Sequence, residues 1–145
     1  MSEILRIYQL AEDALPQRDC IQRACCCQFA QTGREPFVTE AEMQALQEEL
    51  RRQGRKIPPP RDDGACPLLT DDGMRCSVYS ARPLGCRTFF CREAGGPATA
   101  REMRDAIQAL NALDEKHRRG KAGSRTLTDA LASARSGKPT HRRWR

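Results

Sequence analysis

The chain has 145 residues, of which 39% are hydrophobic, 5% aromatic and 30% charged, and its net charge is +6. This length suits one domain, or one domain with a tail. The sequence contains no run of about 20 apolar residues, which excludes a membrane-spanning helix. Because apolar residues are few, the hydrophobic core is expected to need additional stabilisation by disulfides or a structural metal.

The start of the chain predicts a helix over residues 1–18. Ser2 can cap its first turn, and Pro16 marks its end. Apolar residues follow one another at helical spacing, at Ile4, Tyr8, Ala11 and Leu15. The segment lacks the basic and apolar pattern of a secretory leader, so we expect a protein of the reducing cytoplasm.

Eight cysteines follow in two groups, and none occurs after position 91. The first group has the pattern C-x4-C-C-C and comprises Cys20, Cys25, Cys26 and Cys27. The second has the pattern C-x9-C-x9-C-x4-C and comprises Cys66, Cys76, Cys86 and Cys91. Structural disulfides are rare in a reducing cytoplasm, so thiols at this density indicate metal binding. All eight cysteines are therefore candidate metal ligands, within a domain expected over residues 19–94.

A second helix is predicted between the two cysteine groups. Thr39 and Glu42 have the spacing of a capping box, and Gly54 marks the end of the helix. Its apolar face comprises Met43, Leu46 and Leu50. The sequence IPPPRDDG, residues 57–64, cannot continue a helix, because proline lacks the backbone donor and blocks the preceding turn.

The region of the second cysteine group predicts loops and a short hairpin. Turn signals recur there, at Asp72-Gly73 and at Pro83-Leu84-Gly85. Proline restricts its own backbone and that of the preceding residue, so Arg82-Pro83 is expected to fix a turn that aims Cys86.

Residues 98–135 predict further helices that pack on the cysteine domain. Thr99 and Glu102 repeat the capping-box spacing, and Gly120 ends the first of these helices. Its apolar stripe comprises Met103, Ile107, Leu110 and Leu113. A short helix is expected around 126–135, followed by a flexible basic tail over 136–145.

The positive charge lies in the last third of the chain. Residues 92–145 carry 13 Lys and Arg against 6 Asp and Glu, whereas residues 1–91 carry 12 against 13. A solvated basic face is the ordinary interpretation. We expect a protein partner of unknown identity, and nucleic-acid binding by the basic tail is a less favoured alternative because no nucleic-acid motif accompanies it.

Three other features have an ordinary structural interpretation beside a functional one. The acidic pairs Asp62-Asp63 and Asp71-Asp72 stand next to glycines, which favours turns over a carboxylate metal site. Tyr79 is expected to be a core residue with a polar tip rather than a residue that orients a ligand. His117 is expected to cap or pack the last turn of its helix rather than to bind metal.

The arrangement of the cysteines along the chain favours an iron–sulfur cluster over zinc. Thiolate is a soft ligand that selects zinc, copper(I) or iron–sulfur clusters. Neighbouring side chains of an extended segment point to opposite sides, so residues 25–27 cannot easily all bind one zinc ion. A multi-iron cluster accepts ligands from more directions, although one or two zinc ions remain the alternative. The arginines among the cysteines could offset the thiolate charge; they are Arg23, Arg75, Arg82, Arg87 and Arg92.

These residues resemble the YkgJ-type cysteine-cluster family, which is described as a zinc- or iron-chelating domain. The resemblance covers about residues 20–91 and is most specific in the second half. The matching pieces are Cys26-Cys27, Thr39 with Glu42, Cys66-Pro67-Leu68-Leu69, Cys76 with Tyr79, Arg82-Pro83-Leu84-Gly85-Cys86-Arg87, and Cys91. Arg23 stands where the family has a cysteine, and Cys25 is a candidate replacement for it. The resemblance implies a metal-binding module and does not define a reaction.

Together these patterns predict a small α-rich, irregular, metal-stabilised domain, with helices flanking a loop-rich cysteine cluster. Three functions remain open: an iron–sulfur protein for electron transfer, cluster handling or sensing; a zinc module with a structural or interaction role; and a thiol-based redox-responsive protein. No hydrolase triad, metalloprotease motif or phosphate-binding loop is present, so an enzymatic role is left open only through a bound redox cluster.

Overall fold

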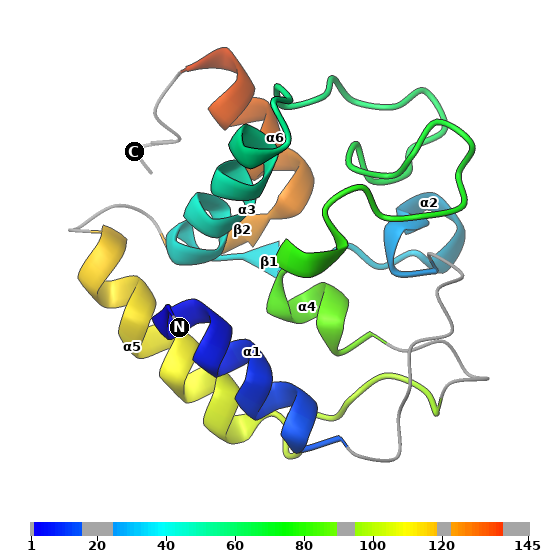
Figure 1. Ribbon diagram of the computed structural model, residues 1–145. Helices are drawn as coiled ribbons and strands as arrows, with labels where there is room; N and C mark the ends of the chain where they lie inside the picture. Colours follow the sequence, from blue (N-terminus) through cyan, green and yellow to red (C-terminus); the bar gives the residue numbers. More distant parts are fainter. Residues whose placement is uncertain (1, 16–24, 90–94, 119–122, 138–145) are drawn as a thin grey trace, which may run out of the picture.

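The computed structural model describes residues 2–15, 25–89, 95–118 and 123–137 (Figure 1). These residues form six α-helices, two short 3-10 helices and one two-stranded sheet, which confirms a small α-rich domain with a loop-rich cysteine region. The elements are α1 (Glu3–Asp13), η1 (Cys25–Cys27), α2 (Phe29–Thr32), β1 (Phe37–Val38), α3 (Glu40–Arg52), η2 (Tyr79–Ala81), α4 (Leu84–Arg87), α5 (Arg104–Arg118), β2 (Arg125–Thr126) and α6 (Leu127–Ser136). Across the described ranges, no helix has both the length and the apolar character needed to cross a membrane.

Helix α1 is capped as the sequence predicts. The hydroxyl of Ser2 accepts a hydrogen bond from the backbone N–H of Leu5 at 3.4 Å. Its buried face packs against α5, so that the two helices lie side by side (Figure 1). The helix ends at Asp13, earlier than the predicted residue 18, and residues 16–18 lie outside the described ranges.

Helix α3 begins with the predicted capping box. The backbone N–H of Thr39 donates to the carboxylate of Glu42 at 2.9 Å, and the backbone N–H of Glu42 donates to the Thr39 hydroxyl at 3.3 Å. The predicted apolar face is also confirmed, because all three of its residues are buried; they are Met43, Leu46 and Leu50. The glycine predicted to end the helix, Gly54, has φ 69°, a left-handed conformation that favours glycine.

The prediction for the helix after residue 98 is correct in part. The reciprocal bonds of Thr99 and Glu102 are present, but the regular helix α5 begins at Arg104. Ile107, expected on the apolar stripe, is 38% exposed, whereas Ala106 is buried. Helix α5 contacts both α1 and α3, so its buried residues are not confined to the single predicted stripe. The predicted helix around 126–135 is α6, and Thr126 caps it.

The buried side chains form two clusters. The helical core lies between α1 and α5, and it comprises Ile7, Tyr8, Ala11, Leu15, Ala41, Leu84, Met103, Ala106, Leu110 and Leu113. The cysteine-side core comprises Cys27, Phe29, Val38, Met43, Leu46, Leu50, Ala65, Cys66, Leu68, Leu69, Val78, Leu127, Ala130 and Leu131. Strands β1 and β2 pair antiparallel, with Phe37 opposite Thr126, and this pairing fixes the start of α6 beside the cysteine-side core.

The predicted hairpin of the second cysteine group exists as a single bridge. Leu69 pairs with Cys76 across a tight turn, and the backbone N–H of Thr70 donates to the carbonyl of Arg75 at 2.8 Å. The prediction did not include the short helices η2 and α4 that follow, because three or four residues carry too little periodicity to reveal a helix.

Candidate metal centre

The structure brings together five of the eight candidate cysteines. All five carry free thiols and are buried or half-buried; they are Cys26, Cys27, Cys66, Cys76 and Cys86. The side chain of Cys25 and the whole of Cys20 and Cys91 lie outside the described residues. Two sequence groups separated by a helix and a linker therefore meet at one place in the fold.

Residues 25–27 form the 3-10 helix η1, not the extended segment expected from the sequence. In a 3-10 helix successive side chains diverge by about 120°, because one turn contains three residues. Cys27 points into the cysteine-side core, whereas Cys26 is half-buried at its edge. The expected strand alternation is therefore wrong for this segment, and the thiols of Cys26 and Cys27 lie within hydrogen-bonding reach of each other.

The second cysteine group is joined to η1 through the backbone. The N–H of Cys66 donates to the carbonyl of Cys27 at 2.8 Å, and the N–H of Leu69 donates to the carbonyl of Cys66 at 3.0 Å. The bridge between Leu69 and Cys76 then places the Cys76 thiol beside that of Cys27. These bonds hold three cysteines at fixed backbone positions.

Cys86 is carried by the one-turn helix α4, whose N-cap is Pro83. The backbone N–H of Cys86 donates to the carbonyl of Pro83 at 3.0 Å, which agrees with the predicted turn that aims this cysteine. Gly85 lets the helix approach Pro36, since an added Cβ would lie 2.7 Å from the Pro36 Cβ. Any larger residue at this position would push α4 away from the segment that leads into β1.

The side chain of Glu42 holds the first residue of α4 in place. Its carboxylate accepts a hydrogen bond from the backbone N–H of Leu84 at 2.7 Å, in addition to the capping bond from Thr39. The side chain is buried, and burial raises the pKa of Glu42. The capping box was predicted from sequence, but this second bond, which spans 42 positions, had no sequence signal.

The thiols interact strongly with one another. Cys27 is the central thiol, and hydrogen bonding with its three neighbours Cys26, Cys66 and Cys76 raises the pKa of Cys27. The same interaction lowers the pKa of Cys26 to about 6, because its thiolate accepts from the Cys27 thiol. Hydrogen bonding with Cys27 also lowers the pKa of Cys76, whereas burial raises the pKa of Cys86. A cation at the site would favour deprotonation of the whole group.

Arg82 acts electrostatically on three of the described thiols. Its positive charge favours the thiolate forms of Cys26 and Cys76, and it partly opposes the rise that burial causes in the pKa of Cys86. The guanidinium is buried, lies 3.8 Å from the ring centre of Tyr79, and donates to the Tyr79 carbonyl at 3.1 Å. Tyr79 itself is 40% exposed, so its expected place in the core is wrong; it supports the arginine instead.

Arg87 connects the cysteine region to α1. It donates to the Arg82 carbonyl at 2.7 Å and to the Glu12 carboxylate at 2.8 Å, and it lies 4.1 Å from the ring centre of Tyr8. Of the other predicted arginines, Arg75 is exposed on the hairpin turn, and Arg23 and Arg92 lie outside the described residues.

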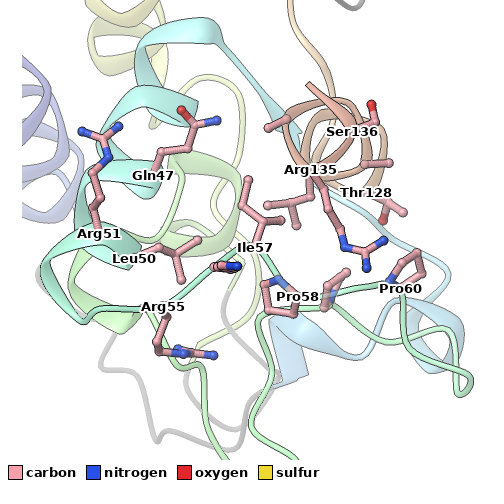
Figure 2. A pocket seen from close by; sticks show the side chains of 15 residues that line it. Gln47, Leu50, Arg51, Arg55, Ile57, Pro58, Pro60, Thr128, Arg135 and Ser136 are labelled. Atoms are coloured by element: carbon pink, nitrogen blue, oxygen red, sulfur yellow. The ribbon is translucent and has the colours of Figure 1, made fainter. Parts of the chain in front are cut away.

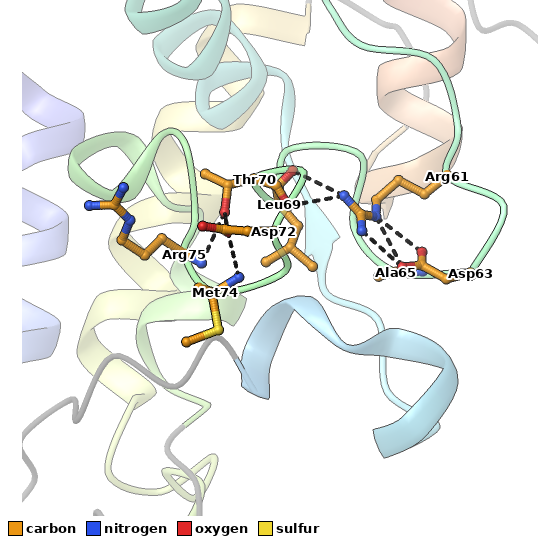
Figure 3. Close-up of polar contacts among 8 residues, drawn as sticks. All are labelled: Arg61, Asp63, Ala65, Leu69, Thr70, Asp72, Met74 and Arg75. Atoms are coloured by element: carbon orange, nitrogen blue, oxygen red, sulfur yellow. Dashed lines mark hydrogen bonds and ion pairs between the residues drawn. The ribbon is translucent and has the colours of Figure 1, made fainter.

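The acidic pairs build turns, as predicted. Asp63 accepts from the backbone N–H of Ala65 at 3.0 Å and forms an ion pair with Arg61 at 2.9 Å (Figure 3). Asp72 accepts from the Thr70 hydroxyl at 2.6 Å and from the backbone of the hairpin turn. These bonds use the carboxylates locally, and the hydrogen bonds from Arg61 and from the Ala65 backbone lower the pKa of Asp63 to about 2.

The imidazole of His117 lies 3.0 Å from the Leu113 carbonyl, in the last turn of α5, as expected for a capping role. Within the described part of the chain, no three His, Cys, Asp or Glu side chains already have the arrangement of a metal-binding group. The donor set nevertheless fits a soft metal, because the gathered groups are thiols and a buried arginine stands beside them.

The half-buried Cys26 borders a cavity. It lines a cavity of about 500 Å³ together with Arg34, Gly85 and Phe89, between the β1 segment and α5. A small molecule can therefore reach Cys26 from this side, whereas Cys27 and Cys86 are buried.

Among the five described cysteines, we expect Cys26 to be the first to react in the reduced, metal-free protein. Because its pKa is lowered to about 6, most of it is thiolate at pH 7, and its alkylation rate should reach half its maximum near pH 6. Alkylation by iodoacetamide across pH 5–9, read by peptide mass spectrometry, measures this midpoint. A midpoint near that of an ordinary thiol, about 8.5, would show that the neighbouring thiols do not stabilise this thiolate.

Comparison with known proteins agrees with this arrangement. Residues 18–108 match the family model CxxCxxCC, described as "Putative zinc- or iron-chelating domain". The match confirms the family resemblance found in the sequence, and it covers every candidate cysteine together with α3, α4 and the start of α5. No curated protein and no solved structure matched the chain.

Proposed function

Because the chain belongs to the CxxCxxCC family of zinc- or iron-chelating domains, we propose that its cysteines hold an iron–sulfur cluster used in electron transfer, cluster handling or sensing. The observation that carries this proposal is the convergence of five thiols from both sequence groups. One zinc ion accepts four ligands, so a single zinc site would leave at least one of these thiols in excess.

The surroundings of the thiols support the same proposal. A cluster held by thiolates is anionic, and its stability depends on nearby positive charge and on hydrogen bonds to sulfur. Arg82 is buried beside the thiols and is held by Tyr79, so it can provide that charge without moving. A bound cluster would supply one-electron chemistry, while the chain would hold it, shield it and set its charge.

We propose that the ligands come from all eight cysteines. Five of them lie in the described residues: Cys26, Cys27, Cys66, Cys76 and Cys86. The other candidates are Cys20, Cys25 and Cys91. Substitution of each cysteine in turn distinguishes the thiols that bind the cluster from those that only surround it. The zinc alternative requires two ions or an unused thiol, and the thiol-redox alternative requires that no metal is bound.

Anaerobic purification followed by a visible spectrum and metal analysis tests this proposal. A brown protein with a broad band near roughly 400 nm, containing iron and acid-labile sulfide, is the expected result. A colourless sample with one or two zinc ions per chain would replace it with a zinc module. A sample without either metal, whose thiols alkylate rapidly, would support the thiol-redox function instead.

A further inference from the structure

A large groove lies on the opposite side of the cysteine-side core from α5. It has a volume of about 910 Å³ and is bounded by the C-terminal half of α3, by residues 55–60 and by α6 (Figure 2). Four basic side chains line it: Arg51, Arg55, Lys56 and Arg135. The residues that line it include no aspartate, no glutamate and no aromatic residue. We call this feature the basic groove.

The charges of the basic groove are largely uncompensated. Arg51 approaches Glu48 at 3.8 Å, but both side chains are more than 70% exposed, and such pairs contribute little. Arg55 donates to the neutral amide of Gln53 at 3.1 Å. In the described residues, no carboxylate forms an ion pair with Arg55, Lys56 or Arg135. The groove therefore favours an anionic occupant.

The floor of the basic groove is apolar and firmly supported. Ile57 is half-buried, so part of its side chain is open to the groove, and it packs against the cysteine-side core, which includes the fully buried Leu50 and Leu131. Pro58 and Pro60 line the side opposite α3, and Arg135 extends from α6 toward them in Figure 2. Proline lacks a backbone donor, so this wall offers apolar contact and few hydrogen bonds.

We propose that the basic groove binds a short acidic segment of a protein partner, which places an apolar side chain on the floor between its carboxylates. A single-stranded nucleic acid would also suit the charge, but its bases normally stack on aromatic side chains, and the groove has none. This inference goes beyond the proposed metal function, because it concerns a surface that contains none of the cysteines.

Fluorescence anisotropy of the full-length, anaerobically purified protein with a fluorescein-labelled peptide EELEELEE tests this inference at low salt. We expect saturable binding that weakens about tenfold in the double variant Arg55→Glu/Arg135→Glu, since two attractive contacts become repulsive. The control Arg6→Glu/Arg104→Glu makes the same change in net charge on exposed positions of α1 and α5, and it should shift the affinity less than about twofold. Metal content equal to wild type shows that each variant is folded.

Two further probes separate the possible occupants. Replacing both leucines of the peptide with serine should weaken binding several-fold, because the apolar floor then loses its contact. An oligo-dT of eight nucleotides should bind more weakly than EELEELEE. The proposal is overturned if the peptide does not bind, if both double variants lose affinity equally, if serine peptides bind as well as leucine peptides, or if oligo-dT binds more tightly.

Discussion

Replacement of Cys27 with serine is expected to remove most of the bound metal. The Cys27 thiol lies at the centre of the gathered cysteines and interacts with Cys26, Cys66 and Cys76, so any site built from these groups includes its position. Serine keeps the size and the backbone of the residue but is a hard, neutral ligand that does not replace a thiolate. We expect metal occupancy to fall more than about tenfold, the range over which even outer-shell changes act.

The same variant should also lose stability. Structural metal sites contribute folding free energy directly, so loss of metal lowers the unfolding temperature. A buried serine hydroxyl without a partner would add about 1–3 kcal/mol to that loss. Metal and sulfide content, together with thermal unfolding in the presence and absence of a chelator, measure both effects. If metal removal dominates, a chelator should lower the melting temperature of the wild type but hardly change that of the variant.

Ala130→Ser is the matched control for Cys27→Ser. Ala130 is fully buried in the same cysteine-side core but is not a cysteine, so the control adds a hydroxyl to that core without removing a thiol. It should lose stability and keep its metal. Full retention of metal and sulfide by Cys27→Ser would remove Cys27 from the ligand set, and metal loss by both variants would assign the effect to core damage.

The helices that carry local signals could be predicted from the sequence. Ser2 and Thr39 begin α1 and α3 as predicted, because a capping bond joins residues only three positions apart. The apolar face of α3 was also correct, since its periodicity extends over several turns. The stripe predicted for α5 was wrong at Ile107, which is 38% exposed while its neighbour Ala106 is buried, because periodicity alone does not tell which apolar residue at the edge of a stripe is covered by a neighbouring helix.

The candidate site could be predicted in residue type but not in arrangement. Cysteine counts and spacing indicated candidate ligands, yet no sequence pattern showed that Cys27 lies among three other thiols or that the charge of Arg82 acts on them. Tyr79 was expected in the core, and it lies half-exposed against that arginine instead. These placements depend on bonds between distant positions, such as Glu12 with Arg87, which local propensity does not contain.

Glu42 is the clearest case of such a distant bond, and Glu42→Ala is expected to destabilise the protein by about 3–5 kcal/mol. The change leaves two buried backbone donors, those of Thr39 and Leu84, without the carboxylate that they reach at 2.9 and 2.7 Å. Each unsatisfied donor costs about 1–3 kcal/mol. Because Leu84 begins the helix that carries Cys86, metal occupancy should fall as well. Denaturant unfolding and metal analysis of the same preparation measure both.

Glu102→Ala is the matched control, because Glu102 makes the same capping box with Thr99 at an exposed position. Loss of an exposed cap typically costs about 1 kcal/mol and should leave the metal in place. If the two variants lose equal stability and both keep their metal, Glu42 acts only as a cap and does not support α4.

The conservative variant Glu42→Gln separates the hydrogen bonds of the side chain from its charge. It retains one acceptor oxygen, so its loss of stability should lie between those of the wild type and Glu42→Ala. Burial raises the pKa of Glu42 above its unfolded value, so the folded chain binds a proton that the unfolded chain has already released. This contribution to stability is complete below the unfolded pKa, about 4.3, and is lost as pH rises through the folded pKa. Unfolding measured from pH 4 upward should show this decline in the wild type and a flatter profile in Glu42→Gln, and equal profiles would mean that the carboxylate stays ionised inside the fold.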